Sequence, residues 1–351
     1  MQVEQSPPDA STEEEPTDSD GVVDSGIVSS DEDVVDEQER LDSPLVTVVI
    51  TTYNRPSYLA DAVESVRKQT YDPIELVIVD DHSDVPAEEV LDDSIRDAFD
   101  AVQCIRHDQN RGANAARNTG IEAATGEYIA FLDDDDRWEP GKVARQVQVF
   151  QAEDDVGVTY TGLRTINIED SGVVVPPEIE GNITKELLCR NVIGTLSAVM
   201  VSADLAREVQ FDEAFPSWAD LEWYINVSTM TNFRRIPEPL VIYEYDSHNR
   251  LSEDFGKKRR AYERFIVEFD DLAAQYGLRC RRKMRGWAAF RLGSTALALN
   301  QYGHARRMLA IALRWYPLEP RFLKYFVATL GGRYTHDLAR GLKRFVATVS
   351  T

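Results

Sequence analysis

The sequence predicts an α/β fold: a mixed, mostly parallel sheet flanked by helices, followed by a helical C-terminal region. Short runs rich in β-branched residues alternate with amphipathic stretches from residue 45 to residue 150. This alternation is typical of parallel strands joined by helical crossovers. From residue 256 onward, amphipathic stretches follow one another without strands between them. The hydrophobic content of 43 % over 351 residues is sufficient for a packed core.

Charge divides the chain into three regions. Residues 1–42 carry 15 acidic residues and one basic residue, and they contain no aromatic residue. Such a segment cannot bury enough apolar surface to offset its chain entropy, so we expect it to be disordered. Residues 43–255 should form the globular domain. Residues 256–351 carry 20 Lys and Arg against 6 Asp and Glu, which predicts a basic, amphipathic helical region.

Three predicted strands end in polar residues. Asn54, Asp80–Asp81 and Asp133–Asp136 each follow a run of buried character. Ligands of parallel sheets bind at the carboxyl ends of the strands, so we expect the three clusters to meet in one crevice. The expected strands of this part are 45–50, 74–79, 102–106 and 127–132, with helices over 57–69, 87–99 and 112–124. Further along, we expect strands at 156–165, 197–201 and 240–245, and helices at 217–229, 257–276, 280–300, 303–315, 320–330 and 335–348.

The run Asp133–Asp136 is a candidate site for a divalent cation. Hard cations take carboxylate oxygens as ligands, and a cation with open positions can also bind a diphosphate. In so acidic a protein, a solvated acidic loop is the alternative. The position of the run, directly after a buried strand and ahead of Trp138 and Pro140, favours a binding site.

Four motifs give a more specific indication. They are VVITTYNR at 48–55, VIVDDHS at 77–83, NRGANAARNTG at 110–120 and FLDDDD at 131–136. In this order and spacing they resemble the family 2 inverting glycosyltransferases, and the resemblance covers about residues 44–255. It implies a GT-A (Rossmann-like) fold, a nucleoside-diphosphate sugar as donor, with a UDP-sugar favoured, and Mn²⁺ or Mg²⁺ as cofactor.

The resemblance also implies a nucleotide site. Thr51 and Tyr53 would line the nucleotide pocket. Asp80 or Asp81 would accept hydrogen bonds from the base or ribose, as a carboxylate can. Arg117 would reach the base or the diphosphate, and its alternative role is an ion pair on a helix face.

Within the acidic run, the resemblance implies a DxD motif formed by Asp133 and Asp135. Asp133 would lie nearer the ribose and Asp135 on the metal, and Asp134 would belong to the donor site. Because four aspartates follow one another, the register stays open, and Asp134 or Asp136 could be the ligand instead.

Inverting transfer needs a general base for the acceptor hydroxyl, opposite the metal. The segment at 215–223, FPSWADLEW, resembles the second acidic motif of the family, usually a Glu-Asp or Gln-Asp pair at a helix start. Ala219 replaces the first member, so Asp220 alone would be the base, with Glu222 as the alternative. Asp220 could instead be a carboxylate that stabilises a helix N-terminus. Trp218 would offer its ring to a sugar or belong to the core.

A further loop lies where related enzymes approach the diphosphate. His248 and Arg250 in this loop would complete the phosphate or acceptor site, and a surface loop without function is the alternative. The basic C-terminal region interleaves cationic and aromatic residues, which suits an anionic membrane surface. Packing of this region on the catalytic domain is the alternative. Nothing in it matches a nucleic-acid motif.

We expect the protein to be located in the cytoplasm. Any contact with a membrane is expected at its cytoplasmic face. The three cysteines are without CxxC spacing, and neither an export signal nor a membrane span is recognisable. The net charge of -23, with Arg far more frequent than Lys, is typical of halophiles and predicts a haloarchaeal source.

The expected function is transfer of a sugar to a glycan or polyprenyl-linked saccharide, in the assembly of surface glycans or protein N-glycans. A nucleotidyltransferase is one competitor, but it would need a Gly-rich basic loop after the first strand, and Thr51–Asn54 is not one. A non-catalytic binding or scaffold protein is the other, since Ala219 departs from the family motif.

Overall fold

The computed structural model describes residues 43–91, 93–166, 171–244 and 254–330. Three predictions lie outside these residues. They are the disordered acidic segment at 1–42, the loop with His248 and Arg250, and the helix at 335–348.

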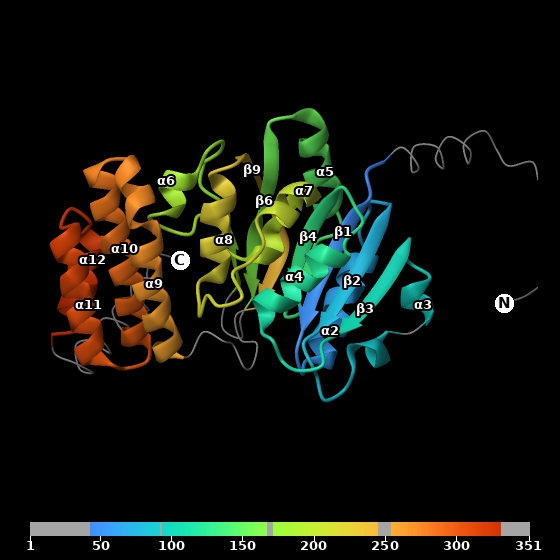
Figure 1. Cartoon of the computed structure of the whole chain (residues 1–351), viewed down its shortest axis with the longest axis horizontal. Helices are drawn as coiled ribbons and strands as arrows, with labels where there is room; N and C mark the ends of the chain where they lie inside the picture. The colour runs from blue at the N-terminus through green and yellow to red at the C-terminus, as the bar shows by residue number, and fades with distance from the viewer. Residues whose placement is uncertain (1–42, 92, 167–170, 245–253, 331–351) are drawn as a thin grey trace, which may run out of the picture. The chain divides into compact units, whose positions relative to one another are not determined.

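A mixed sheet forms the centre of the α/β part (Figure 1). Its order is β3-β2-β1-β4-β8-β6-β9-β5, and β7 pairs with β6. Strands β3, β2, β1 and β4 are parallel neighbours, β8 runs antiparallel to β4 and β6, and β9 is parallel to β6. The predicted α/β class is therefore confirmed. The strands are β1 (Val46–Thr52), β2 (Ile74–Asp80), β3 (Ala101–Arg106), β4 (Tyr128–Asp133), β5 (Asp136–Trp138), β6 (Val156–Ile166), β7 (Ser171–Val174), β8 (Val199–Ser202) and β9 (Asn232–Glu244).

Helices cover both faces of the parallel strands, because side chains alternate between the faces along each strand. In β1, Val48 and Ile50 belong to the core that includes α2 and α5, whereas Val49 belongs to the core that includes α4 and α8. Both faces are thus apolar, and polar side chains are left at the strand ends. The helices of this part are α2 (Pro56–Arg67), α4 (Ala113–Ala123), α5 (Lys142–Ala152), α6 (Thr184–Leu187), α7 (Ala203–Glu208) and α8 (Ala219–Ser228).

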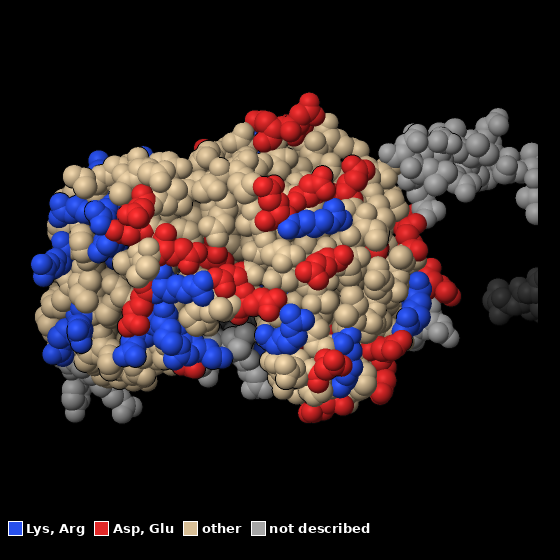
Figure 2. Space-filling model, in the orientation of Figure 1, with Lys and Arg blue, Asp and Glu red and all other residues tan. Residues whose placement is uncertain are grey.

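The C-terminal helices pack on the α/β part (Figure 1). Phe265 and Phe269 of α9 and Met284 of α10 share one buried core with Trp223 and Tyr224 of α8. This packing agrees with the alternative that the basic region packs on the α/β part. Its cationic side chains gather on the surface (Figure 2). Among the described helices, none is long and apolar enough to cross a membrane. The helices are α9 (Phe255–Gln275), α10 (Leu278–Ala298), α11 (Tyr302–Trp315) and α12 (Pro320–Ala328).

Local predictions failed where the chain turns sharply or where a strand contains proline. The helix expected over 87–99 is two short pieces, η1 (Ala87–Val90) and α3 (Asp93–Arg96). Strand β9 is far longer than the expected 240–245. The prediction was too short because Pro237 and Pro239 interrupt the strand pattern of the sequence; in the structure they coincide with register shifts against β6. Strand β5 and helix α5 were not expected at all.

Candidate active site

The three polar clusters meet at one end of the sheet, as predicted. Thr51 is level with Asp133 across the β1–β4 pairing, and Thr52 is level with Asp80 across the β1–β2 pairing. The parallel register alone therefore brings residues far apart in sequence to a common edge.

The loops after β1 and β2 are tied to each other. The Asn54 backbone N–H donates to Ser83 Oγ at 2.9 Å, and the Asp84 N–H donates to Asn54 Oδ1 at 2.6 Å. Asn54 has a φ of 56°, a left-handed conformation that asparagine tolerates better than most residues. The neighbouring Tyr53 is 48 % exposed, so its ring is free to contact a ligand.

Asp80 is buried and holds its own loop together. Its carboxylate accepts from the Ser83 N–H at 2.8 Å, the Ala87 N–H at 3.1 Å and Arg106 Nη1 at 2.9 Å. Such bonds shape the turn after β2, and they leave little of the carboxylate for a ligand.

Asp81 holds the loop of the 110–120 motif. Its carboxylate accepts from His107 Nδ1 at 2.8 Å and from the backbone N–H groups of Arg111 and Gly112, both at 2.7 Å. Gly112 has a φ of +92°, which an L side chain rarely adopts, so glycine is required there. The motif is thus connected to the strand end through Asp81.

The four aspartates alternate between exposed and buried positions. Asp133 ends β4, Asp134 and Asp135 form a turn, and Asp136 begins β5. The side chains of Asp133 and Asp135 are 30 % and 15 % exposed, whereas that of Asp134 is 7 % exposed and residue Asp136 is 1 % exposed. The two accessible carboxylates are therefore the first and third of the run.

The second aspartate is held from two sides. Thr52 Oγ1 donates to Asp134 Oδ2 at 2.8 Å, and Arg55 Nη1 donates to Asp134 Oδ1 at 3.0 Å. Burial raises the pKa of Asp134 to about 6, and Arg55 and Thr52 oppose that rise. The same Arg55 nitrogen lies 3.1 Å from Asp135 Oδ2 and so joins the two carboxylates.

The fourth aspartate anchors the run to η2 (Leu196–Ala198), the short 3-10 helix directly before β8. Ser197 Oγ donates to Asp136 Oδ2 at 2.6 Å and accepts from the Asp133 N–H at 3.1 Å. Trp138 Nε1 donates to the Ser197 carbonyl at 2.9 Å. Burial raises the pKa of Asp136 well above its usual range. These contacts make Asp136 a support for the turn.

Arg117 connects α4 to the acidic run. Its Nη2 lies 2.8 Å from Asp133 Oδ1, and its guanidinium lies 5.6 Å from the Phe211 ring centroid. The alternative role predicted for Arg117 was an ion pair along one helix face. In the structure Arg117 instead forms an ion pair between α4 and the end of β4.

Helix α8 presents its two carboxylates to different surroundings. The charges of Arg117, Arg291 and Asp133 act on Asp220, and burial raises its pKa above the usual range. Glu222 is buried, and it faces Asp212, Arg264 and Glu268 instead. Positions two residues apart point to different sides of a helix, so only Asp220 faces the acidic run.

Burial, together with the negative charges of Glu268 and Asp212, raises the pKa of Glu222 to about 8. Asn226 donates to one of its carboxylate oxygens, and the other, Oε2, has no hydrogen-bond partner among the described residues. Glu222 is thus a buried carboxyl on the α9 side of α8.

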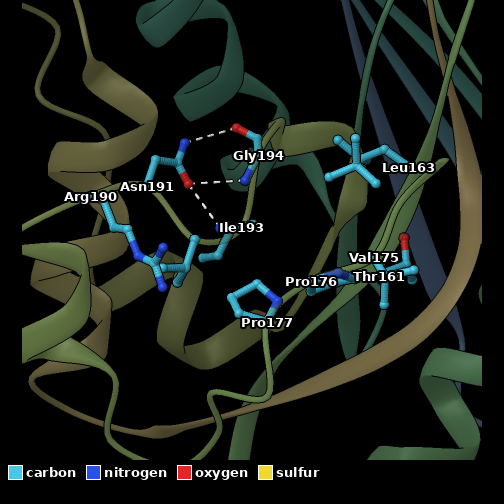
Figure 3. A pocket seen from close by; sticks show the side chains of 11 residues that line it. Thr161, Leu163, Val175, Pro176, Pro177, Arg190, Asn191, Ile193 and Gly194 are labelled. Carbon is cyan, nitrogen blue, oxygen red and sulfur yellow. Dashed lines mark hydrogen bonds between the residues drawn. The ribbon is translucent and has the colours of Figure 1, made fainter. Parts of the chain in front are cut away.

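A pocket lies between β6, the segment 174–177 and the segment 190–194 (Figure 3). Its volume is about 180 Å³. Asn191 lines it, donates to the Gly194 carbonyl at 2.8 Å and lies 3.5 Å from Asp220 Oδ2. Apolar residues form much of the remaining wall: Leu163, Val174, Val175, Pro176, Pro177, Val192 and Ile193.

Within the described ranges, no group of three or more His, Cys, Asp or Glu side chains is arranged to hold a metal ion. The accessible pair Asp133 and Asp135 nevertheless suits a hard cation that takes other ligands from a bound diphosphate, since such a cation needs only one or two carboxylates from the protein. The residues present therefore fit a metal that shares its shell with a substrate.

Comparison with known proteins identifies the α/β part. Residues 47–203 match the family model described as glycosyl transferase family 2. The α/β part thus contains a region similar to glycosyl transferase family 2, which spans less than half of the chain. The match includes all four motifs and ends ahead of Asp220, so the candidate base lies beyond it.

Two curated relatives are similar to the α/β part. An uncharacterized glycosyltransferase of Nostoc sp. is 44 % identical over 115 residues, which cover 33 % of this chain and 35 % of that protein. Escherichia coli WfaP, named a UDP-Glc:alpha-D-GlcNAc-diphosphoundecaprenol beta-1,3-glucosyltransferase, is 37 % identical over 109 residues, which cover 31 % of this chain and 42 % of WfaP. The similarity thus spans less than half the length of either relative.

Solved structures support the fold. S. aureus TarS 1–349 in complex with UDP-GlcNAc has a TM-score of 0.59 at 14 % identity, covering 83 % of this chain and 87 % of TarS. A Pyrobaculum calidifontis mannosyltransferase in complex with GDP-Man and Mn²⁺ has a TM-score of 0.53 at 16 % identity, covering 82 % and 86 %. The α/β part therefore has the predicted GT-A-like fold, with a helical region after it.

Three residues of the site were not predicted: Arg55 as the partner of two aspartates, Ser197 and Arg291. Arg55 lies inside the first motif, so its position was a usable signal. Ser197 and Arg291 reach the site through η2 and α10, and no motif marks them.

Proposed function

We propose that this chain is a metal-dependent inverting glycosyltransferase. It moves a sugar from a nucleoside-diphosphate sugar, with a UDP-sugar favoured, to a hydroxyl of a glycan or polyprenyl-linked saccharide. The observation that carries the proposal is that the guanidinium of Arg117 interacts with two carboxylates, those of Asp133 and Asp220. Arg117 pairs with Asp133 at the strand end, and its charge also acts on Asp220 at the start of α8.

The comparisons support the choice of donor and acceptor. TarS has a solved structure with UDP-GlcNAc, and the Pyrobaculum enzyme one with GDP-Man and Mn²⁺. The name of WfaP describes a UDP-sugar donor and an acceptor linked to diphosphoundecaprenol. These proteins make a nucleotide sugar the first donor class to test, and a lipid-linked saccharide the first acceptor class.

The donor would bind at the strand ends. Thr51 and the exposed Tyr53 would line the nucleotide pocket, and Asp80 or Asp81 would contribute through the loops that they shape. Asp133 and Asp135 would hold Mn²⁺ or Mg²⁺ together with the donor diphosphate. The metal, when bound, neutralises the charge that develops on the departing diphosphate.

The transfer step would follow from the position of Asp220. Its carboxylate accepts the proton of the acceptor hydroxyl. The acceptor oxygen forms a bond to the anomeric carbon while the bond from that carbon to the diphosphate oxygen breaks. The nucleoside diphosphate leaves with the electron pair, and the configuration at the anomeric carbon inverts. The raised pKa of Asp220 makes it a better proton acceptor than an exposed aspartate.

The acceptor would approach from the side of Asn191. This residue contacts Asp220 and lines the pocket of Figure 3, whose walls are mostly apolar. Trp218, predicted as a sugar platform, lies two residues before Asp220 and is partly buried. A saccharide could therefore reach the base between Trp218 and the pocket.

The first experiment is a thermal-shift screen of the full chain with UDP-, GDP- and dTDP-sugars, each with and without Mn²⁺. A bound donor raises the unfolding temperature in proportion to its occupancy. We expect one nucleotide class to stabilise the protein, and more so with metal. Nucleoside diphosphate release in the presence of saccharide acceptors then tests turnover.

The competitors predict different products. A nucleotidyltransferase would release pyrophosphate from a nucleoside triphosphate and a sugar phosphate. A scaffold protein would bind a nucleotide sugar without turnover under any acceptor. Either result would reject the proposed function.

The basic composition of residues 256–351 leads to a proposal on where in the cell the protein acts. We expect the full chain to float with vesicles that contain anionic phospholipid and not with neutral vesicles, because cationic side chains are attracted to an anionic surface. Equal flotation with both kinds of vesicle would contradict membrane contact through this region.

A further inference from the structure

The helical region brings a cation to the start of α8. The Arg291 guanidinium of α10 lies over the Trp218 ring, with its Cζ 4.9 Å from the ring centroid. Trp218 precedes Asp220 by two residues, has a left-handed φ of 65° and packs against the cores that include α9 and α10. Its ring also meets the Phe265 ring of α9 edge to face, at 6.0 Å. Arg291 is therefore placed beside the candidate base by packing between three helices.

Lys258 of α9 is a second cation on which the charge of Arg291 acts. Lys258 of α9 is partly buried, and both burial and the positive charge of Arg291 lower its pKa. Burial lowers the pKa of Arg291 to about 10, while the negative charge of Asp220 acts in the opposite direction. Two like charges on α9 and α10 thus act on each other, and burial disfavours the charged form of both.

Neither cation has an ion-pair partner in the part of the chain that the structure describes, where every carboxylate is more than 4.0 Å from both. Other arginines of the same helices are paired: Arg264 with Asp212, and Arg281 and Arg285 with Asp270. Burying two cations whose counter-charge, that of Asp220, lies beyond ion-pair distance is unfavourable, and a bound anion would reduce that cost.

The position of the two cations separates them from the donor side. Arg55 and Arg117 already form ion pairs with the strand-end aspartates Asp133, Asp134 and Asp135. Arg291, in contrast, stacks on Trp218 and acts on Asp220 from the side of α9 and α10. An anion held there would lie beyond the base, where the acceptor and not the donor is expected.

We propose that Arg291 and Lys258 form an anion site for the acceptor. The site would bind a phosphate or diphosphate group on the saccharide that receives the sugar. The proposal rests on the proposed function, because Asp220 is what makes this the acceptor side. A guanidinium binds two phosphate oxygens at once, and a neighbouring ammonium adds a point charge. The free edge of Trp218 would contact the saccharide that joins the phosphate to the reacting hydroxyl.

The experiment uses the full chain with its donor site filled by UDP and Mn²⁺. The probe is α-D-glucose 1-phosphate, with methyl glucoside as its neutral counterpart, and calorimetric titration measures the affinity. We expect the wild type to bind the sugar phosphate and not the glucoside. Arg291→Gln should weaken this binding by about tenfold or more, as loss of a charged hydrogen-bonding partner does, and Lys258→Gln should weaken it less.

Arg279→Gln is the matched control. It removes an exposed arginine of the same helix, about 18 Å along its axis from Arg291, and it should bind the probe like the wild type. Circular dichroism of every variant reports whether the protein is folded, and the Kd of UDP reports separately on the donor site. Should Arg291→Gln fail to fold, Lys258→Gln and the charge-retaining Arg291→Lys carry the test.

Three results would overturn the proposal: no binding of the sugar phosphate by the wild type, equal affinity in wild type and in Arg291→Gln and Lys258→Gln, or a loss of UDP affinity in Arg291→Gln. The last result would place Arg291 at the donor. Failure of the proposed function is distinct, because the wild type would then bind no nucleotide or turn over no nucleotide sugar, whatever the sugar phosphate does.

Discussion

The two halves of the candidate site are built in different ways. The donor half is a set of strand ends whose positions follow from backbone register, and its arginines are paired with aspartates. The other half is made of side chains from α8, α9 and α10, and two of its cations, Arg291 and Lys258, are unpaired within the described residues. The comparison suggests that the donor half is ordered before any ligand binds, whereas the acceptor half is completed by the charge of its ligand.

The largest expected effect is at the boundary between the halves. Asp220→Asn keeps the shape of the side chain and removes the base, so kcat should fall by about 10²- to 10⁴-fold. The Kd of the donor should stay nearly unchanged, because Asp220 is proposed to contact the acceptor and not the donor. Steady-state kinetics and calorimetry measure the two quantities. An unaltered kcat would show that the acceptor half lacks the proposed base.

A smaller effect is expected within the acidic run. Asp135→Asn should lower kcat/KM by about 10²- to 10³-fold, as loss of a charge-stabilising group does, and should raise the Mn²⁺ concentration needed for half-maximal rate. Asp136→Asn is the matched variant: its side chain is buried against Ser197 and cannot touch a ligand, so its loss should be much smaller. Equal losses in both variants would contradict the alternation of the four aspartates.

The third prediction concerns pH and the other face of α8. The pKa of Glu222 is about 8 in the folded protein and lies in the ordinary glutamate range after unfolding. The folded state therefore binds the proton more tightly, and stability should fall as pH rises from about 4.5 to 8. Glu222→Gln cannot ionise.

Relative to the wild type, Glu222→Gln should therefore gain about 1–4 kcal/mol of unfolding free energy between pH 5 and pH 9. Chemical denaturation at both pH values measures this gain. A constant difference between the two proteins would mean that Glu222 ionises normally, and that the two carboxylates of α8 do not differ as described.

The smallest effect tests how the helical region holds its cations. A Cβ at Gly286 would lie 2.9 Å from Tyr316 Cβ and 3.3 Å from the Ala312 carbonyl, so Gly286→Ala should destabilise the protein by about 1–3 kcal/mol. Gly303→Ala is the control, because a Cβ there meets nothing within 4 Å, and it should stabilise α11 by up to about 1 kcal/mol. Thermal denaturation of both variants measures the contrast, and destabilisation by both would refute close α10–α11 packing as the cause.

The sequence by itself determined the α/β class, the strands β1, β2 and β4 to within a few residues, and the meeting of their polar ends. These features are local or follow from parallel pairing: alternation of strands and helices predicts the sheet, and register then aligns Thr51 with Asp133. The four motifs carried the family resemblance for the same reason, since each is a short segment at a strand end or helix start.

Only the tertiary structure decided which side chains face one another. The sharp turn between β4 and β5 separates Asp133 and Asp135 from Asp134 and Asp136. Packing of α8 between the sheet and α9 directs Asp220 and Glu222 to different surroundings, and docking of α10 brings Arg291 to Trp218. Periodicity predicts which face of a helix is apolar, but it does not specify which distant element covers that face, because that choice depends on packing across the whole core.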